Sequence, residues 1–122
     1  MSTRAVVTIK DENDTFHIYT HSDGYPEYQV KRIADAVPFA WPFPRFQAMD
    51  FAAAFVRGSK EKGGGNIYFT TDWKAHGDLE YRYEITATAK ALQITVFAVS
   101  GEVSEKRWTG TLAEMQSKYQ QS

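Results

Sequence analysis

The residues His21 to Pro26 (HSDGYP) bring an imidazole, a carboxylate and a phenol close together in the chain. Gly24 permits backbone conformations that other residues resist, and Pro26 suits the first turn of a helix because its missing N–H costs nothing there. We therefore interpret the segment as a loop between a strand and a helix, where backbone N–H groups at the helix start can meet an anion. An imidazole, a carboxylate and a phenol in such a loop suit the binding of a partner or acid–base catalysis. In the alternative, structural interpretation Asp23 caps the helix while His21 and Tyr25 pack against it.

Further ligand-type side chains are spread along the chain. His17 and His21 are four residues apart, which on a strand separates them by about 13 Å, so they are not expected to chelate one ion. Asp72 and His76 would join His21 only if two loops met, so we predict no metal and no cofactor. Cysteine is absent and Ser22 cannot form a triad by adjacency alone, so no catalytic residue is assigned. The side chains expected to border a site are His17, Tyr19, His21, Asp23, Tyr25, Trp41, Asp72 and His76.

Two strands precede the loop. Residues Arg4–Lys10 and Thr15–Thr20 alternate between apolar and polar side chains, which predicts a strand in each. The short polar segment Asp11–Asp14 between them favours an antiparallel hairpin. Three side chains of the second strand then share the face opposite its apolar residues, namely His17, Tyr19 and His21.

Two helices are predicted after the loop. The first starts at Pro26 and runs for about three turns, because apolar residues recur at helical spacing. Three prolines then predict an extended, aromatic connection over Pro38–Arg45. A buried second helix is expected from Phe46 to Ser59. The apolar stripe expected on this helix consists of Met49, Ala52, Ala53 and Val56, widened by Phe51 and Phe55.

The remaining sequence predicts strands over residues 67–71, 79–88 and 92–99, an edge strand over 103–109 and a short C-terminal helix. In the strand over 79–88, Glu80, Arg82 and Glu84 are expected on a solvated face. Thr111 and Glu114 fit a capping box at the start of the last helix. The glycines 63–65 follow a helix and precede a strand, so they predict a helix C-cap and a loop, not a phosphate cradle.

These elements predict one α+β domain over residues 1–122. We expect a mainly antiparallel sheet of five or six strands, in the order β-β-α-α-β-β-β/β-α, with the helices packed on one face. The sequence leaves the oligomeric state open.

The composition excludes several classes of function. Hydrophobic residues make up 43% of the chain and the formal net charge is -1, which is typical of a globular protein and lacks the basic excess of nucleic-acid binders. No apolar run reaches the length of a membrane span or a signal peptide, so we expect a soluble, cytoplasmic protein without membrane contact.

Several aromatic residues fit either a base-stacking sheet face or the core, and the missing basic excess favours the core. They are Tyr68, Tyr81, Tyr83, Phe97 and Trp108.

The segment HIYTHSDGYP (residues 17–26) resembles a group of small bacterial and phage proteins that carry an H-x-D-G-Y-P signature after a strand and mostly have no assigned function. The segments at 41–46, 49–56, 63–72 and 76–85 resemble the longer form of that group, so the resemblance covers roughly residues 3–100. It implies a bacterial, phage or mobile-element origin and transfers no catalytic residues. Many members of the group carry a bulky ring at the position of Ser22.

Three hypotheses for the function follow. The first is a non-enzymatic binding or interaction protein that contacts a protein partner or a small ligand through a surface centred on the loop His21–Pro26. The second is a metal-assisted or acid–base hydrolase, or a binder, that takes a small phosphorylated or nucleotide ligand with His21, Asp23 and His76. The third is a structural module in which the loop only caps a helix.

Overall fold

The alternating residues at the start of the chain form the expected hairpin. In the computed structural model, which describes residues 3–60 and 67–119, strand β1 (Ala5–Lys10) pairs antiparallel with β2 (Thr15–Thr20). The apolar side chains of β1 at alternate positions all enter the core, as the period of two requires. The prediction for this hairpin is confirmed to within one residue.

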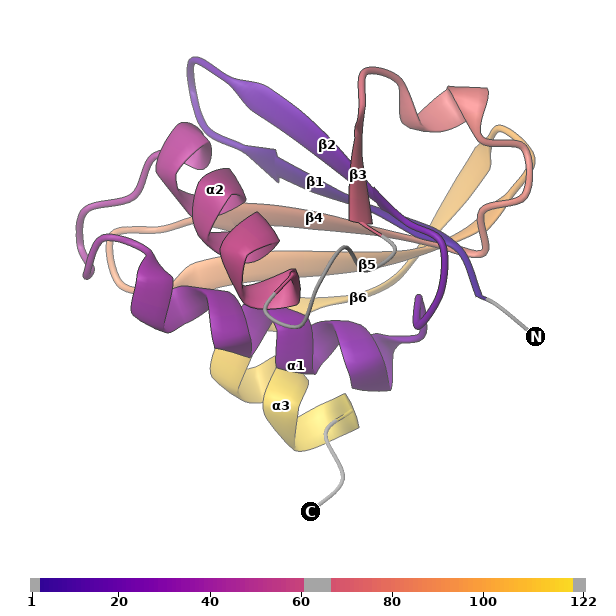
Figure 1. The fold of residues 1–122 in the computed structure, drawn as a ribbon. Coiled ribbons are helices and arrows are strands. Elements are labelled where there is room, and N and C mark those ends of the chain that lie inside the picture. The colour runs from indigo at the N-terminus through magenta and orange to yellow at the C-terminus, as the bar shows by residue number, and fades with distance from the viewer. Residues whose placement is uncertain (1–2, 61–66, 120–122) are drawn as a thin grey trace.

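The hairpin belongs to a six-stranded sheet in the order β3-β2-β1-β4-β5-β6 (Figure 1). The other strands are β3 (Ile67–Thr70), β4 (Tyr81–Ala87), β5 (Leu92–Ser100) and β6 (Val103–Thr111). Among the strands of the described residues, four neighbouring pairs are antiparallel, and β1 and β4 run parallel. The chain is therefore α+β with a mainly antiparallel sheet, as predicted. The parallel pair arises because both central helices lie between these two strands in the chain.

Helices α1 (Pro26–Ala36), α2 (Ala48–Ser59) and α3 (Leu112–Tyr119) cover one face of the sheet (Figure 1). Their buried side chains form one core with those of β1, β2, β4 and β5. The capping box of α3 is confirmed, because the N–H of Thr111 donates to Glu114 Oε1 at 2.8 Å and the N–H of Glu114 donates to Thr111 Oγ1 at 3.2 Å. The predicted C-cap at glycines 63–65 lies outside the described residues.

The buried face of α2 differs from the prediction. Met49 is 54% exposed and Ala53 also faces solvent. An alanine-rich helix offers several nearly equivalent apolar stripes, so spacing alone did not select the buried one. The predicted extended connection before α2 also differs, since it opens with the single-turn helix η1 (Val37–Phe39). The buried residues of α2 are Ala48, Phe51, Ala52, Ala54 and Phe55.

The sheet face opposite the helices is partly covered, which corrects the prediction that Arg82 is solvated. Trp73, in the short helix η2 (Trp73–Ala75), packs against this face. The Arg82 guanidinium lies 4.7 Å from the Trp73 ring and 4.3 Å from the Phe97 ring, and the residue is only 8% exposed. The aromatic residues suggested for an open face are also divided. Phe97 lies on it, whereas Tyr83 is fully buried under the helices and Trp108 contacts α3.

Candidate functional site

The loop His21–Pro26 is held by a close approach of two backbones. The N–H of Gly24 donates to the carbonyl of Thr3 at 2.9 Å. A Cβ atom at position 24 would lie 2.7 Å from that carbonyl oxygen and 3.1 Å from the Cβ of Ala5. Real Cβ atoms do not approach a backbone oxygen so closely, so only glycine fits here. This explains the glycine of the signature in structural terms.

Two buried side chains fix the loop from the core. Gln29, fully buried on α1, donates from Nε2 to the carbonyl of Asp23 at 2.8 Å. The Tyr83 hydroxyl, fully buried on β4, donates to the carbonyl of Gly24. Burial raises the pKa of Tyr83 well above its ordinary value, so the phenol remains a donor. Because buried donors hold two consecutive carbonyls, the loop has little freedom.

Asp23 does not cap α1. Tyr25 occupies the N-cap position, and no described side chain makes a cap hydrogen bond there. Asp23 instead adopts a φ of 58°, a left-handed conformation that aspartate tolerates better than most residues. Its carboxylate lies 3.5 Å from Arg32 Nη2, and Arg32 also donates to Thr20 Oγ1 at 2.8 Å. Of the two interpretations left open by the sequence, the one in which Asp23 caps the helix is therefore wrong, and Asp23 joins the loop to the middle of α1.

The loop divides its side chains between the two sides of the sheet. His21 continues the face of β2 that points away from the helices and contacts Tyr19. Asp23 turns toward α1, and Tyr25 packs edge-on against Tyr81 at a centroid distance of 5.8 Å while remaining 42% exposed. His21 and Asp23 consequently point to different environments, although only Ser22 separates them in the chain.

A cluster on the open face surrounds His21. We call it the Tyr19 cluster and define it as Arg4, Tyr19, His21, His76 and Asp78. The Tyr19 hydroxyl lies 3.0 Å from His21 Nδ1, and the Tyr19 ring stacks on His76 with centroids 4.3 Å apart. Burial, followed by the charge of Asp78, raises the pKa of Tyr19, so its hydroxyl stays protonated beside His21. Tyr19 thus connects the two predicted histidines.

Arg4 and Asp78 complete this cluster. Arg4 Nε lies 3.3 Å from His21 Nδ1 and 3.1 Å from Asp78 Oδ2. His76 Nε2 is 2.8 Å from Thr70 Oγ1. Arg4 and Asp78 were not identified as site residues from the sequence. The available signals were that Arg4 lies directly before β1 and that Asp78 directly follows His76 and Gly77. The cluster offers hydrogen bonds, a partly exposed cation and stacked rings, which suit recognition of a polar or aromatic group.

Three other predicted residues serve local structure. Asp72 accepts the N–H of Lys74 at 2.9 Å and so caps η2. Trp41 stacks under Arg45 at 3.5 Å in the segment before α2. That segment lies at the other end of the hairpin from His21, because the N–H of Ala48 bonds to the β1–β2 turn. His17 faces the same side as Tyr19 but lies 2.8 Å from Thr8 Oγ1.

The described residues contain no group of three or more His, Asp or Glu side chains that could hold a metal ion. Within the same residues, no helix is long and apolar enough to cross a bilayer. No protein-family model matches this chain, and neither a curated protein nor a solved structure matches it.

Acidification should destabilise the protein through His17. Burial, together with the nearby charge of Arg82, lowers the pKa of His17. The unfolded chain, with a pKa of about 6.5, therefore takes up this proton before the folded protein does. The stability that neutral His17 contributes is thus present above about pH 6.5 and is lost as the pH falls through that value toward the lower folded-state pKa.

This expectation can be measured by urea unfolding at pH values about one unit above and one unit below 6.5. The wild-type protein should lose more stability on acidification than the variant His17→Gln, whose amide can still bond to Thr8 but does not titrate. Equal losses in the two proteins would show that His17 does not carry the effect.

Proposed function

We propose that this chain is a non-enzymatic binding protein that contacts a partner protein with the end of the sheet where the loop His21–Pro26 lies. The observation that carries the proposal is the construction of this loop. Buried donors from Gln29 and Tyr83 hold its backbone, while Tyr25 stays 42% exposed. A rigid loop that presents exposed side chains loses little entropy when it binds.

The chemistry of the surface supports this assignment. Tyr25 and Tyr28 are 42% and 49% exposed at the start of α1, and the Tyr19 cluster lies on the other side of the loop. Tyrosine and arginine are enriched at the centres of protein–protein interfaces, because they combine apolar area with hydrogen bonding. The contact surface that we propose therefore runs from Tyr25 across the loop to His21.

The arrangement of side chains favours binding over hydrolysis. A hydrolase that uses His21, Asp23 and His76 needs all three groups at one reacting centre. The carboxylate of Asp23 pairs with Arg32 on the helix side, whereas His76 stacks on Tyr19 on the open face. We also propose a bacterial, phage or mobile-element origin, because of the signature in residues 17–26, and a cytoplasmic location.

The test is affinity purification of the tagged protein from extracts of its source cells. The variants are His21→Ala with Tyr25→Ala and, as a matched control, Phe43→Ala, because Phe43 is 39% exposed in the segment before α2. We expect the wild type and Phe43→Ala to retain the same proteins and the double variant to lose at least one of them. Retention of every partner by a folded double variant would contradict the proposal. Should the double variant unfold, Tyr25→Lys alone serves the same comparison.

A further inference from the structure

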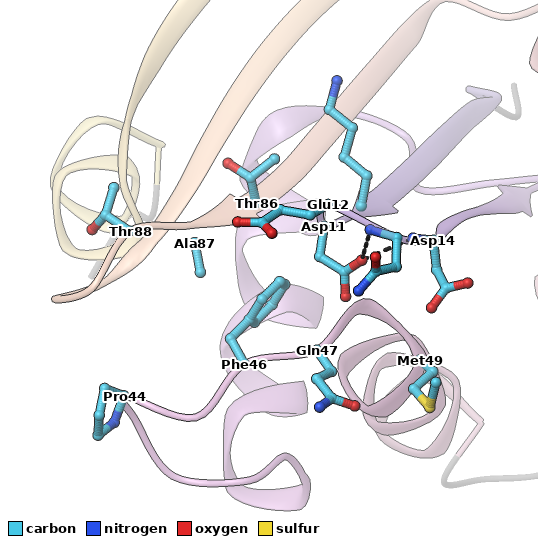
Figure 2. Close-up of a pocket in the computed structure, with 12 residues that line it drawn as sticks. Asp11, Glu12, Asp14, Pro44, Phe46, Gln47, Met49, Thr86, Ala87 and Thr88 are labelled. Carbon is cyan, nitrogen blue, oxygen red and sulfur yellow. Dashed lines mark hydrogen bonds between the residues drawn. The ribbon is translucent and has the colours of Figure 1, made fainter.

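A groove lies at the end of the sheet opposite the loop. Its volume is about 680 Å³, and three segments line it, namely the β1–β2 turn, residues 44–49 before and at the start of α2, and residues 86–88 at the end of β4 (Figure 2). None of the residues in the proposed contact surface lines this groove. Any ligand of the groove is therefore independent of the function proposed above.

Asp11 fixes the two walls of the groove relative to each other. Its carboxylate accepts the N–H groups of Asn13 and Asp14 within the turn, each at 2.8 Å, and the N–H of Ala48 at the start of α2 at 2.7 Å. These backbone hydrogen bonds lower the pKa of Asp11, with the bond from Ala48 contributing most. Asp11 is therefore ionised and structural, and it keeps the groove open in one shape.

Apart from Gln47, the lower wall of the groove is apolar. Phe46 and Pro44 lie below the turn in Figure 2, and Met49 stands at the side. Phe46 is half-buried against Phe51, at a centroid distance of 5.9 Å, whereas Met49 is 54% exposed on the first turn of α2. An exposed methionine beside an aromatic ring is an adaptable surface for the apolar part of a ligand.

The upper rim carries negative charge without compensation. Glu12 and Asp14 have no ion pair or side-chain hydrogen bond with any residue that the structure describes. Lys10, the cation among the lining residues, directs its Nζ to Glu84 on the open face at 3.1 Å. The groove therefore combines a negative rim with an apolar wall, and it repels phosphates.

We propose that this groove binds a basic segment of a partner protein, with arginine or lysine side chains at the Glu12–Asp14 rim and an apolar neighbour against Phe46 and Met49. Charge complementarity selects this occupant. A bare metal ion would leave the apolar wall unused, and the described residues hold no group of three ligands for one. A basic segment with alternating apolar residues uses both features of the groove.

The probe for this proposal is a short fluorescein-labelled peptide of alternating arginine and leucine, and its binding to the full chain is measured by fluorescence anisotropy. The test variant is Glu12→Gln with Asp14→Asn. The control is Asp35→Asn with Glu102→Gln, which changes the net charge equally at exposed positions outside the groove. Met49→Ala tests the apolar wall without changing the charge.

We expect the rim variant to weaken peptide binding by about tenfold and the charge-matched control by less than about twofold. Met49→Ala should also weaken binding, and the same peptide with glutamate in place of arginine should not bind. Equal losses in the rim variant and the control would show nonspecific charge attraction and overturn the proposal. It would also be overturned if the wild type fails to bind the arginine peptide, whether or not the partner test at Tyr25 succeeds.

Discussion

Replacing Gly24 with alanine is expected to lower the free energy of unfolding by about 3 kcal/mol, because overpacking at this position is resisted by backbone atoms. The new Cβ would lie 2.7 Å from the carbonyl oxygen of Thr3, which already accepts the N–H of residue 24. A flexible side chain could rotate away from such a contact, but the Thr3 carbonyl belongs to the backbone directly before β1 and cannot move without breaking that bond. Urea unfolding of the variant measures the loss.

Gly77→Ala is the matched control for this prediction. A Cβ atom at Gly77 meets nothing within 4 Å, so the variant should remain within about 0.5 kcal/mol of the wild type. Similar stabilities for the two variants would mean that the backbone at Gly24 is not confined as described.

Tyr83→Phe is expected to cost about 1–3 kcal/mol, the second-largest effect. The substitution preserves the ring in the core but removes the hydroxyl that donates to the carbonyl of Gly24. That carbonyl would then be buried without this donor, and leaving a buried acceptor unpaired costs more than the bond itself contributes. Thermal or urea unfolding gives the size of the effect.

Tyr81→Phe provides the comparison. Tyr81 stacks beside Tyr83 on the same strand face, with centroids 6.3 Å apart, but its hydroxyl has no hydrogen bond to a described residue. Removal of this hydroxyl should therefore change stability by less than about 0.5 kcal/mol. Equal losses in the two variants would contradict the role that we assign to Tyr83.

The local part of the fold could be predicted from the sequence. Alternation in Ala5–Lys10 and Thr15–Thr20 identified the hairpin because one face of each strand must enter the core. The same period placed Tyr19 and His21 on one face, where their side chains meet. Pro26 marked the start of α1, since a proline is tolerated at the first helical position.

Features that depend on distant segments could not be predicted in this way. Arg82 lies at one of the polar positions in the alternating pattern of β4. It is nevertheless buried, because Trp73 from the η2 segment covers it. The stacking of His76 on Tyr19 likewise requires the segment after β3 to return over the sheet. Periodicity describes the two faces of a strand but contains no information about a loop that crosses one of them.

The roles of Asp23 and Gly24 in the loop His21–Pro26 also depend on residues outside it. Its sequence allowed Asp23 to be either a helix cap or a functional carboxylate, because aspartate suits both. The choice depends on Arg32, nine residues later on the next turns of α1, and on the carbonyl contact with Gln29. Gly24, by contrast, is explained by Thr3, which lies before the first strand of the hairpin, about twenty residues earlier in the chain, so no local pattern connects it with the loop.

The most direct test of the central claim is site-specific photo-crosslinking from the proposed contact surface. A photoreactive phenylalanine analogue replaces Tyr25 in one protein and Phe43 in another, two rings of similar exposure at opposite ends of the hairpin. We predict a discrete crosslinked partner from position 25 that does not form from position 43. If position 25 yields no partner, or if both positions yield the same one, the loop His21–Pro26 is not the contact surface of this protein.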